Sequence, residues 1–139
     1  MSFVDNTRSL NLSAARQMTE AATAFASENK RNISIAVVDS AGELLTLTRM
    51  DGAIAASTEI AYQKARTSVR FKCPTKDLEA GVSSGATSLL KLDLLPFEGG
   101  IPIFSGGQVA GAIGVSGHSP AGDGEVAKAG AEWIARQLG

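Results

Sequence analysis

The sequence is short of the residues that build disulfides, metal cages and membrane spans. Its 139 residues include one cysteine, Cys73, and one histidine, His118. A single cysteine cannot form an internal disulfide, and one cysteine with one histidine is too few for a conventional zinc site. No apolar run approaches the roughly 20 residues that a membrane helix needs. We therefore expect no internal disulfide, no structural zinc and no membrane span.

An excess of charge of one sign is also missing. The chain has 13 Lys and Arg residues against 14 Asp and Glu residues, for a formal net charge of −1. Its longest basic run is Lys30-Arg31, which is too short for a nucleic-acid surface. Residues 1–6 lack the basic and apolar segments of a signal peptide. We expect a cytoplasmic protein whose partner is a small molecule rather than a nucleic acid or a membrane.

What remains is the composition of an ordinary globular domain. Hydrophobic residues make up 44% of the chain and charged residues 19%. The length allows one domain with a substantial core. Residues 1–10 show no periodic pattern, so we expect a loose N-terminal arm over 1–10 and a single domain over 11–139.

Apolar periodicity predicts the order of the secondary-structure elements. Asn11 or Ser13 can cap the first helix, which Asn32 can close, and Ser119 followed by Pro120 is typical of the start of the last helix. Pro74 stops the second helix, and Thr75 can cap a short one that ends at Gly81. In chain order, we expect a helix over 11–31, strands over 33–38 and 44–49, a helix over 54–71, short helical pieces over 75–80 and within 82–93, strands over 101–104 and 109–115, and a helix over 119–138.

This order predicts an α+β fold with a four- to five-stranded antiparallel sheet. Each of the two strand pairs is joined by a turn that contains glycine, as in β-hairpins. Helices follow or precede each hairpin and can cover the sheet. An antiparallel sheet of this kind can bury one face under helices and leave the other face for a partner or a ligand.

The second hairpin, residues 99–117, is rich in glycine and has two interpretations. Gly111, Gly114 and Gly117 weaken a strand unless another backbone or a ligand must come close. One interpretation is that a helix packs tightly on the hairpin. The other is that the loop before the last helix binds an anion through backbone amides. The spacing fits neither a Rossmann fingerprint nor a P-loop.

Several charged residues near predicted strand ends and turns could carry chemistry. Arg49 could hold a carboxylate with two hydrogen bonds, while Asp51, Glu98 or His118 could move a proton. Lys64, in the second predicted helix, could anchor an anion beside a pocket. The alternatives are structural: Arg49 paired with Asp51 or Glu98, Lys64 solvated, and His118 facing solvent.

An ordered series of motifs resembles the GlcG/HbpS family, which includes the C-terminal domain of PduO-type cobalamin adenosyltransferases. The resemblance runs from about residue 11 to the C-terminus. Its motifs are Ile35-Ala36-Val37-Val38-Asp39, Arg49-Met50-Asp51, Ser57, Ile60-Ala61, Lys64-Ala65, Gly99-Gly100-Ile101-Pro102-Ile103, Gly111-Ala112-Ile113-Gly114-Val115-Ser116-Gly117, Asp123 and Val126-Ala127-Lys128-Ala129-Gly130.

The resemblance implies a profilin-like α-β-α sandwich and a homo-oligomer, from dimers up to octamers. It also implies haem as a possible cofactor, because some members bind it. Haem-binding relatives can use a histidine of the N-terminal helix as axial ligand, and residues 11–32 contain none. Haem iron would then need His118, Tyr62, Met50, Lys64 or a residue of a neighbouring subunit.

Three functions follow as hypotheses. The first is a small-ligand-binding protein for haem or another tetrapyrrole, with His118 as the iron ligand. The second is a cofactor-independent catabolic enzyme, an isomerase, lyase or hydrolase that acts on a small carboxylate metabolite. Its catalytic residues would be Asp51, Glu98 and His118, and its ligand-binding residues Arg49, Lys64, Gly99, Gly100, Gly114, Ser116 and Gly117. The third is an oligomeric scaffold without a ligand, in which these side chains pair with one another.

Overall fold

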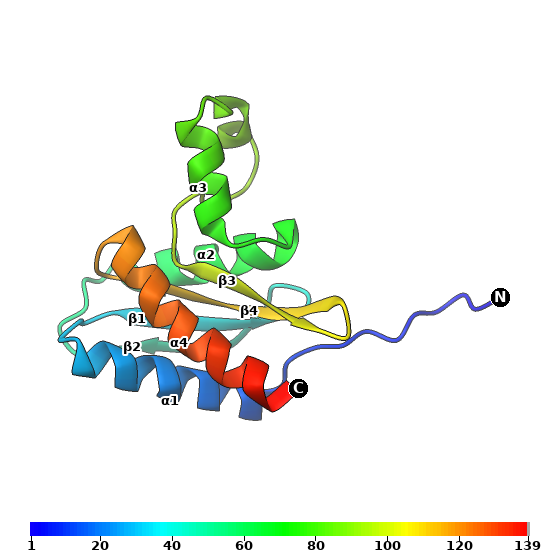
Figure 1. Ribbon diagram of the computed structural model, residues 1–139, viewed down its shortest axis with the longest axis horizontal. Coiled ribbons are helices and arrows are strands. Elements are labelled where there is room, and N and C mark those ends of the chain that lie inside the picture. Colours follow the sequence, from blue (N-terminus) through cyan, green and yellow to red (C-terminus); the bar gives the residue numbers. More distant parts are fainter. Residues whose placement is uncertain (139) are drawn as a thin grey trace.

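The protein is built on a four-stranded antiparallel sheet between helices (Figure 1), in a computed structural model that describes residues 1–138. The strands lie in the order β2-β1-β4-β3, and every neighbouring pair is antiparallel. The strands are β1 (Ser34–Asp39), β2 (Leu44–Arg49), β3 (Gly100–Ser105) and β4 (Gln108–Ser116). The predicted α+β class and the antiparallel sheet of four strands are confirmed.

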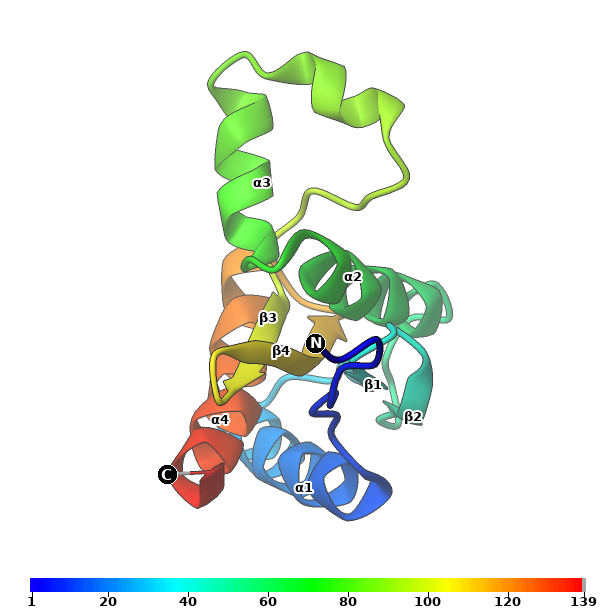
Figure 2. The same cartoon turned by 90° about the vertical axis from the view of Figure 1, so that its right-hand side faces the viewer.

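Helices cover both faces of the sheet. Helices α1 (Leu12–Glu28) and α4 (Pro120–Leu138) lie on one face, and α2 (Ser57–Phe71) lies on the other (Figure 2). Successive residues of β1 alternate between these layers: Ile35 packs in the cluster under α1 and α4, and Ala36 packs in the cluster under α2. The expectation of one uncovered sheet face is therefore wrong, because β1 buries the side chains of both its faces.

Most predicted helix ends are close to the observed ones, and the differences have local causes. The Asn11 side chain accepts a hydrogen bond from the Ala14 amide and caps α1, as predicted. The helix ends at Glu28, and Asn29 rather than Asn32 is its C-cap. Helix α2 begins at Ser57 because Ser57 Oγ donates to the Ile54 carbonyl and holds Ile54 in the preceding turn.

The helix that was predicted over 75–80 runs past its expected end. Helix α3 (Thr75–Ser83) continues through Gly81, and a 3₁₀ turn, η1 (Thr87–Lys91), follows it. Thr75 is its first helical residue and does not cap it. The Thr75 hydroxyl instead accepts a hydrogen bond from the Gly100 amide at 2.8 Å, which ties α3 to the start of β3.

Close packing explains the glycines of the second hairpin. A Cβ atom at Gly114 would lie 2.6 Å from the Ala65 amide nitrogen and would also overlap the Ala61 carbonyl of α2. The helix can therefore cross β4 backbone to backbone only because both sides carry small residues. This supports the first of the two interpretations for Gly114.

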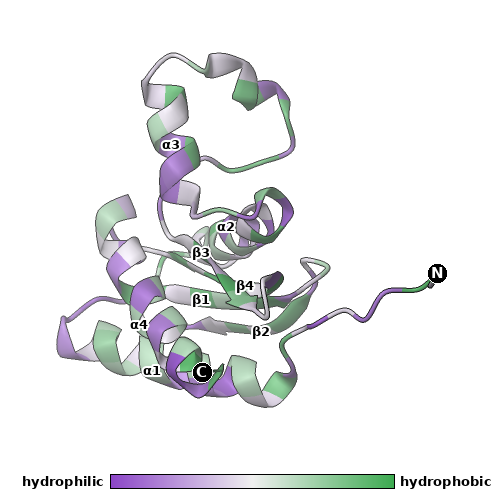
Figure 3. Cartoon of the chain, turned by 45° about the vertical axis from the view of Figure 1, so that its right-hand side comes forward, coloured by the Kyte–Doolittle hydropathy of each residue, from purple (hydrophilic) through white to green (hydrophobic). Residues whose placement is uncertain are grey.

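Residues 75–97 form an arm that stands out from the sandwich, above α2 and the start of β3 (Figures 1 and 2). Thr75 is the only buried residue of α3, and η1 has none. Leu90 in η1 is 58% exposed and Leu92 directly after it is 52% exposed. In Figure 3 the arm shows apolar segments in green between hydrophilic ones. Among the described residues, no helix is long and apolar enough to cross a membrane.

Candidate functional site

The candidate site lies where β4 ends and α4 begins. The chain turns at Gly117, whose φ of 132° lies in a region that residues other than glycine rarely adopt. Gly117 packs against the Asn32 and Ile33 backbones, so a side chain there would also meet them. The turn places His118 directly before α4, where Ser119 Oγ accepts a hydrogen bond from the Gly122 amide and caps the helix as predicted.

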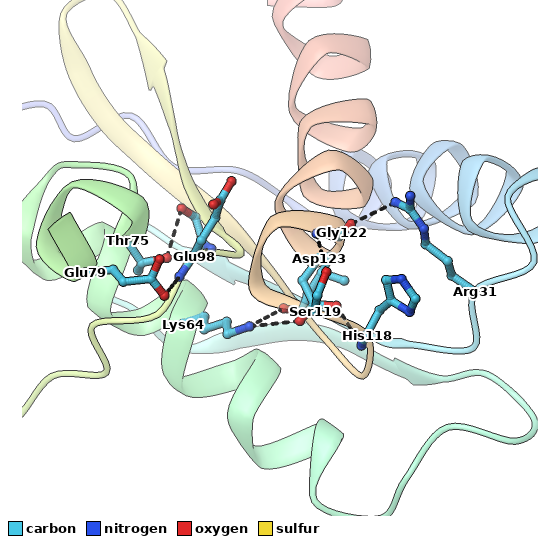
Figure 4. A network of polar contacts seen from close by, with 11 residues as sticks. Arg31, Lys64, Thr75, Glu79, Glu98, His118, Ser119, Gly122 and Asp123 are labelled. Atoms are coloured by element: carbon cyan, nitrogen blue, oxygen red, sulfur yellow. Dashed lines mark hydrogen bonds and ion pairs between the residues drawn. The ribbon is translucent and has the colours of Figure 1, made fainter. Parts of the chain in front are cut away.

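A buried ion pair lies beneath this turn (Figure 4). The Lys64 ammonium of α2 lies 3.2 Å from Asp123 Oδ2 of α4, and each side chain is 3% exposed. Lys64 Nζ also donates to the Val115 carbonyl at 3.0 Å, and the His118 amide donates to Asp123 Oδ1 at 2.9 Å. The pair therefore joins α2, β4 and α4, and it fixes the backbone of His118.

Gly99 makes room for the Lys64 side chain of this pair. Its φ is 136°, and a Cβ atom there would lie 2.8 Å from Lys64 Nζ. The Gly99 carbonyl accepts a hydrogen bond from the Val115 amide, which holds the segment against β4. A larger residue at position 99 would displace the ammonium from Asp123.

Burial raises the pKa of the Asp123 carboxyl above its ordinary value of 3.8. The Lys64 ammonium, the His118 amide and the Lys64 hydrogen bond lower this pKa again, and the balance is upward. Burial without these contacts would leave a far less stable carboxylate, because a charge buried alone is very costly.

An open cleft of about 250 Å³ lies beside the ion pair. Ile54 is 62% exposed at its rim and Phe97 is 48% exposed. The residues that line the cleft are Ile54, Ile60, Lys64, Phe97, Ser116, Gly117, His118, Pro120 and Asp123. The buried Lys64 and Asp123 thus lie at its base, whereas the exposed His118 lies at its edge, beside the apolar side chains of Ile54 and Phe97.

The His118 side chain is available to a ligand. The residue is exposed, and within residues 1–138 its imidazole forms no hydrogen bond. Its ring lies against Gly122, where a side chain would collide with it. Figure 4 shows the ring on the side of α4 that faces Arg31, whose guanidinium binds the Gly122 carbonyl and Glu125. The ring is thus held on one face by packing, while its nitrogens remain free.

Glu98, Gly99 and Gly100 line a second cleft, of about 300 Å³. It lies beside the first, because Phe97 borders one cleft and Glu98 the other. Lys76 of α3 and Lys128 of α4 also line it. Glu98 thus lies apart from the cleft that contains His118.

Arg49 and Asp51 line neither cleft. The Arg49 guanidinium donates two hydrogen bonds, of 3.1 and 3.0 Å, to the Ala53 carbonyl and closes the turn after β2. Asp51 is exposed within that turn. The structure therefore brings together Lys64, Ser116, Gly117 and His118 of the predicted site residues. Gly114 is buried under α2.

Sequence reasoning missed the residues that complete the first cleft. The sequence presents Asp123 only as one of the motifs of the resemblance, and its pairing with Lys64 spans 59 residues of sequence. The helix predicted over 54–71 includes Ile54, which instead lies in the turn before α2. No local signal shows that Phe97 and Ile54, 43 residues apart, share one rim.

Among the residues suggested as haem ligands, His118 fits best. Lys64 Nζ is already bound to Asp123 and Val115, and Met50 packs against the core. Tyr62 is half-buried, with the Arg66 guanidinium over its ring. An exposed imidazole beside an apolar rim has the donor type and the surroundings that haem iron requires. Within the described residues, no group of three His, Cys, Asp or Glu side chains could hold a metal ion.

Comparison of the sequence with protein families identifies a family that covers most of the chain. The model of a family described as "Haem degrading protein HbpS-like" matches residues 10–132. The chain is 41% identical to protein GlcG of Escherichia coli K12 over 92 residues, which cover 66% of this chain and 69% of GlcG.

Solved structures with the same fold agree with this match. The crystal structure of protein ORFY from Klebsiella pneumoniae has a TM-score of 0.91 and 29% sequence identity, with 97% of each chain covered. The crystal structure of a PduOC–haem complex has a TM-score of 0.81 and 29% identity, with 89% of this chain and 94% of that chain covered.

Proposed function

Because the chain belongs to the HbpS-like family, we propose that it binds a small ligand, with haem as the first candidate, in the cleft beside His118. The observation that carries this proposal is the free imidazole of the single histidine at the edge of an apolar rim. The haem complex of the related PduOC domain supports haem as the first ligand to test.

The residues of the cleft would have different roles in binding haem. His118 would donate a ring nitrogen to the iron, and Ile54 and Phe97 would cover an edge of the macrocycle. The Lys64–Asp123 pair would not contact the haem iron. It would position His118, because the Asp123 carboxylate accepts a hydrogen bond from the His118 amide. When bound, haem would supply a redox-active iron. The cleft of about 250 Å³ is smaller than the roughly 300–1,000 Å³ of typical enclosed sites, so much of the macrocycle would remain uncovered.

Haemin titration of the purified protein, followed by visible absorption, tests the proposal. Wild type should give a Soret band that saturates at a fixed stoichiometry. His118→Ala should lose this band or bind at least about tenfold more weakly, the effect of losing ~1.4 kcal/mol of binding free energy. Ile54→Asn should weaken binding severalfold by removing part of the apolar rim.

Leu12→Asn is the matched control for Ile54→Asn. Leu12 is also an exposed apolar side chain, at 43%, but lies on α1 away from the cleft. It should bind haemin as wild type does. A broad rise that does not saturate and is identical in wild type and His118→Ala would mean adventitious haemin and would reject the proposal.

The structure supports the enzyme hypothesis at only one of its proposed catalytic residues. Of its three proposed proton-transfer residues, Asp51, Glu98 and His118, only His118 lines the cleft. A reaction there would have to use His118 together with the Lys64–Asp123 pair. The separation of Glu98 and Asp51 from this cleft favours ligand binding over catalysis by those three groups.

We also propose that the protein forms a homo-oligomer, from a dimer up to an octamer. The support is the arm of residues 75–97, which orders more than 20 residues while burying little of its own apolar surface. Ordering a chain costs about 1–2 kcal/mol per residue in conformational entropy, so such an arm needs contacts to offset it. A second copy of the chain would supply them.

A further inference from the structure

We propose that the outer edge of β2 is an interaction surface that pairs with β2 of a second copy of this chain. The inference rests on the proposed homo-oligomer and names a contact surface for it, distinct from the arm of residues 75–97. β2 and β3 are the two outer strands of the sheet (Figure 2). An outer strand presents backbone N–H and C=O groups that can bond to a further strand. The two edges differ in whether these groups are available.

The outer edge of β3 is closed to another strand. The Gly99 carbonyl accepts a hydrogen bond from the Val115 amide of β4. Because backbone groups alternate in direction along an antiparallel strand, those of Gly100 and Pro102 point away from β4. The Gly100 amide already donates to Thr75 Oγ1 at 2.8 Å, and proline has no N–H to donate. This edge therefore lacks two of the donors that a new ladder would need.

The outer edge of β2 is open. The Met50 amide donates to the Ile33 carbonyl at 3.0 Å, so by the same alternation the backbone groups of Leu47 and Arg49 point away from β1. Within residues 1–138, the backbone of β2 forms hydrogen bonds with no segment other than β1. The strand contains neither proline nor lysine, the residues that commonly protect natural edges. Its outward donors and acceptors are thus free for another strand.

Two leucines add an apolar strip to this edge. Leu44 and Leu47 lie opposite Val38 and Ala36 of β1, whose side chains pack under α2. Residues directly opposite each other share a face of the sheet, so both leucines lie on the α2 side. Leu44 is 42% exposed and Leu47 is 43% exposed. A strand placed beside β2 would cover them while it bonds to the free backbone groups.

A second β2 fits this edge better than a strand of different sequence. Residues 44–48 carry no charge, so two copies meet without like charges along the strand. A two-fold axis perpendicular to the sheet makes the strands antiparallel and keeps both α2 helices on one face, so the leucines of the two copies meet. The strand ends bring Glu43 of one copy toward Arg49 and Asp51 of the other, which leaves both signs of charge at each end.

The variant Leu47→Lys tests the surface through the molar mass, measured by size-exclusion chromatography with light scattering. A lysine on the edge places two like charges near the two-fold axis, so the variant should have at most about half the wild-type mass. Leu12→Lys is the matched control, since Leu12 is also 43% exposed and lies on α1. It should keep the wild-type mass.

Amide hydrogen exchange followed by NMR shows whether backbone pairing is responsible. In wild type the Arg49 amide, which points outward, should exchange at least about tenfold more slowly than in Leu47→Lys. The Thr48 amide faces β1 and should remain slow in both proteins, which shows that the variant is folded. Its fold should persist, because Leu47 belongs to neither core cluster.

The outcomes separate this inference from the proposed oligomer. A monomeric wild type would reject both. An oligomer whose mass is unchanged in Leu47→Lys, or whose Arg49 amide exchanges as fast as in that variant, would overturn the β2 surface alone. Leu90→Asn/Leu92→Asn acts on the arm and should leave the Arg49 amide protected, so loss of protection in that variant would also contradict the assignment.

Discussion

Lys64 and Asp123 are the residues on which the geometry of the first cleft depends most. Both side chains are buried, at 3% exposed each, and their pair joins helices on opposite sides of β4. Replacing one member leaves the other charge buried without its partner, which typically costs about 3–5 kcal/mol.

Lys64→Met should therefore lower the free energy of unfolding by about 3 kcal/mol or more. Chemical denaturation followed by circular dichroism measures this. Lys91→Met, at an exposed position, should stay within about 0.5 kcal/mol of wild type. A Lys64→Met protein as stable as Lys91→Met would show that the ion pair contributes little.

The raised pKa of Asp123 predicts a dependence of stability on pH. A carboxyl with a folded pKa above its unfolded value of 3.8 binds its proton more readily in the folded state. Its contribution to stability is thus fully present below pH 3.8 and is lost as the pH rises through the folded pKa. Relative to Asp123→Asn, which cannot titrate there, wild type should become less stable from about pH 4 upward and then level off. Urea unfolding of both proteins between pH 4 and pH 7 measures the difference in their free energies of unfolding. If wild type instead gained stability relative to Asp123→Asn as the pH rose over that range, the prediction would be contradicted.

At the scale of elements, the contact between α2 and β4 sets the position of Lys64. The contact is close because Gly114 has no side chain and faces Ala61 and Ala65. The same helix then carries Lys64 to the end of β4, where the cleft opens. The small residues on both elements are therefore part of how the site is positioned.

Gly114→Ala should destabilise the fold by about 1–3 kcal/mol or more, because the new methyl group meets backbone atoms that can move only with the whole helix. Thermal unfolding measures the loss. Gly81→Ala is the control: its Cβ atom would meet only Leu89, at 3.6 Å, and alanine in a helix is favoured over glycine by up to about 1 kcal/mol. Equal melting temperatures for the two variants would refute tight packing at Gly114.

At the scale of the whole molecule, the arm of residues 75–97 projects from the layers of helices and sheet. Its base is anchored, since Arg66 and Arg70 bind Asp93 and the Leu95 amide donates to Thr67. Leu90 and Leu92, just before this base, are apolar and exposed. This combination is expected of an element that contacts another subunit.

Leu90→Asn/Leu92→Asn should lower the molar mass in solution, measured by size-exclusion chromatography with light scattering at micromolar concentration. The folded state should persist, because neither side chain is part of the core. Leu12→Asn, an equally polar change on α1, should keep the wild-type mass. A wild-type protein that is already a monomer would rule out the proposed oligomer.

Local sequence patterns were enough to predict the elements and the class of fold. Periods of 3.6 and 2 residues, the Asn11 and Ser119 caps, and glycine-containing turns are local properties, and they were sufficient to predict the helices and the two hairpins. The alternation of Ile35 and Ala36 marked the two faces of β1, although it did not show that a helix covers each of them.

Which charged residues meet depends instead on how the helices pack on the sheet. Lys64 pairs with Asp123 because α2 crosses β4 where both have small residues, a contact that no local pattern encodes. The same packing puts Glu98 and His118 in different clefts, although both lie next to glycines in the second hairpin region. Sequence patterns report the face on which a residue lies, whereas the identity of its neighbours depends on how the layers pack.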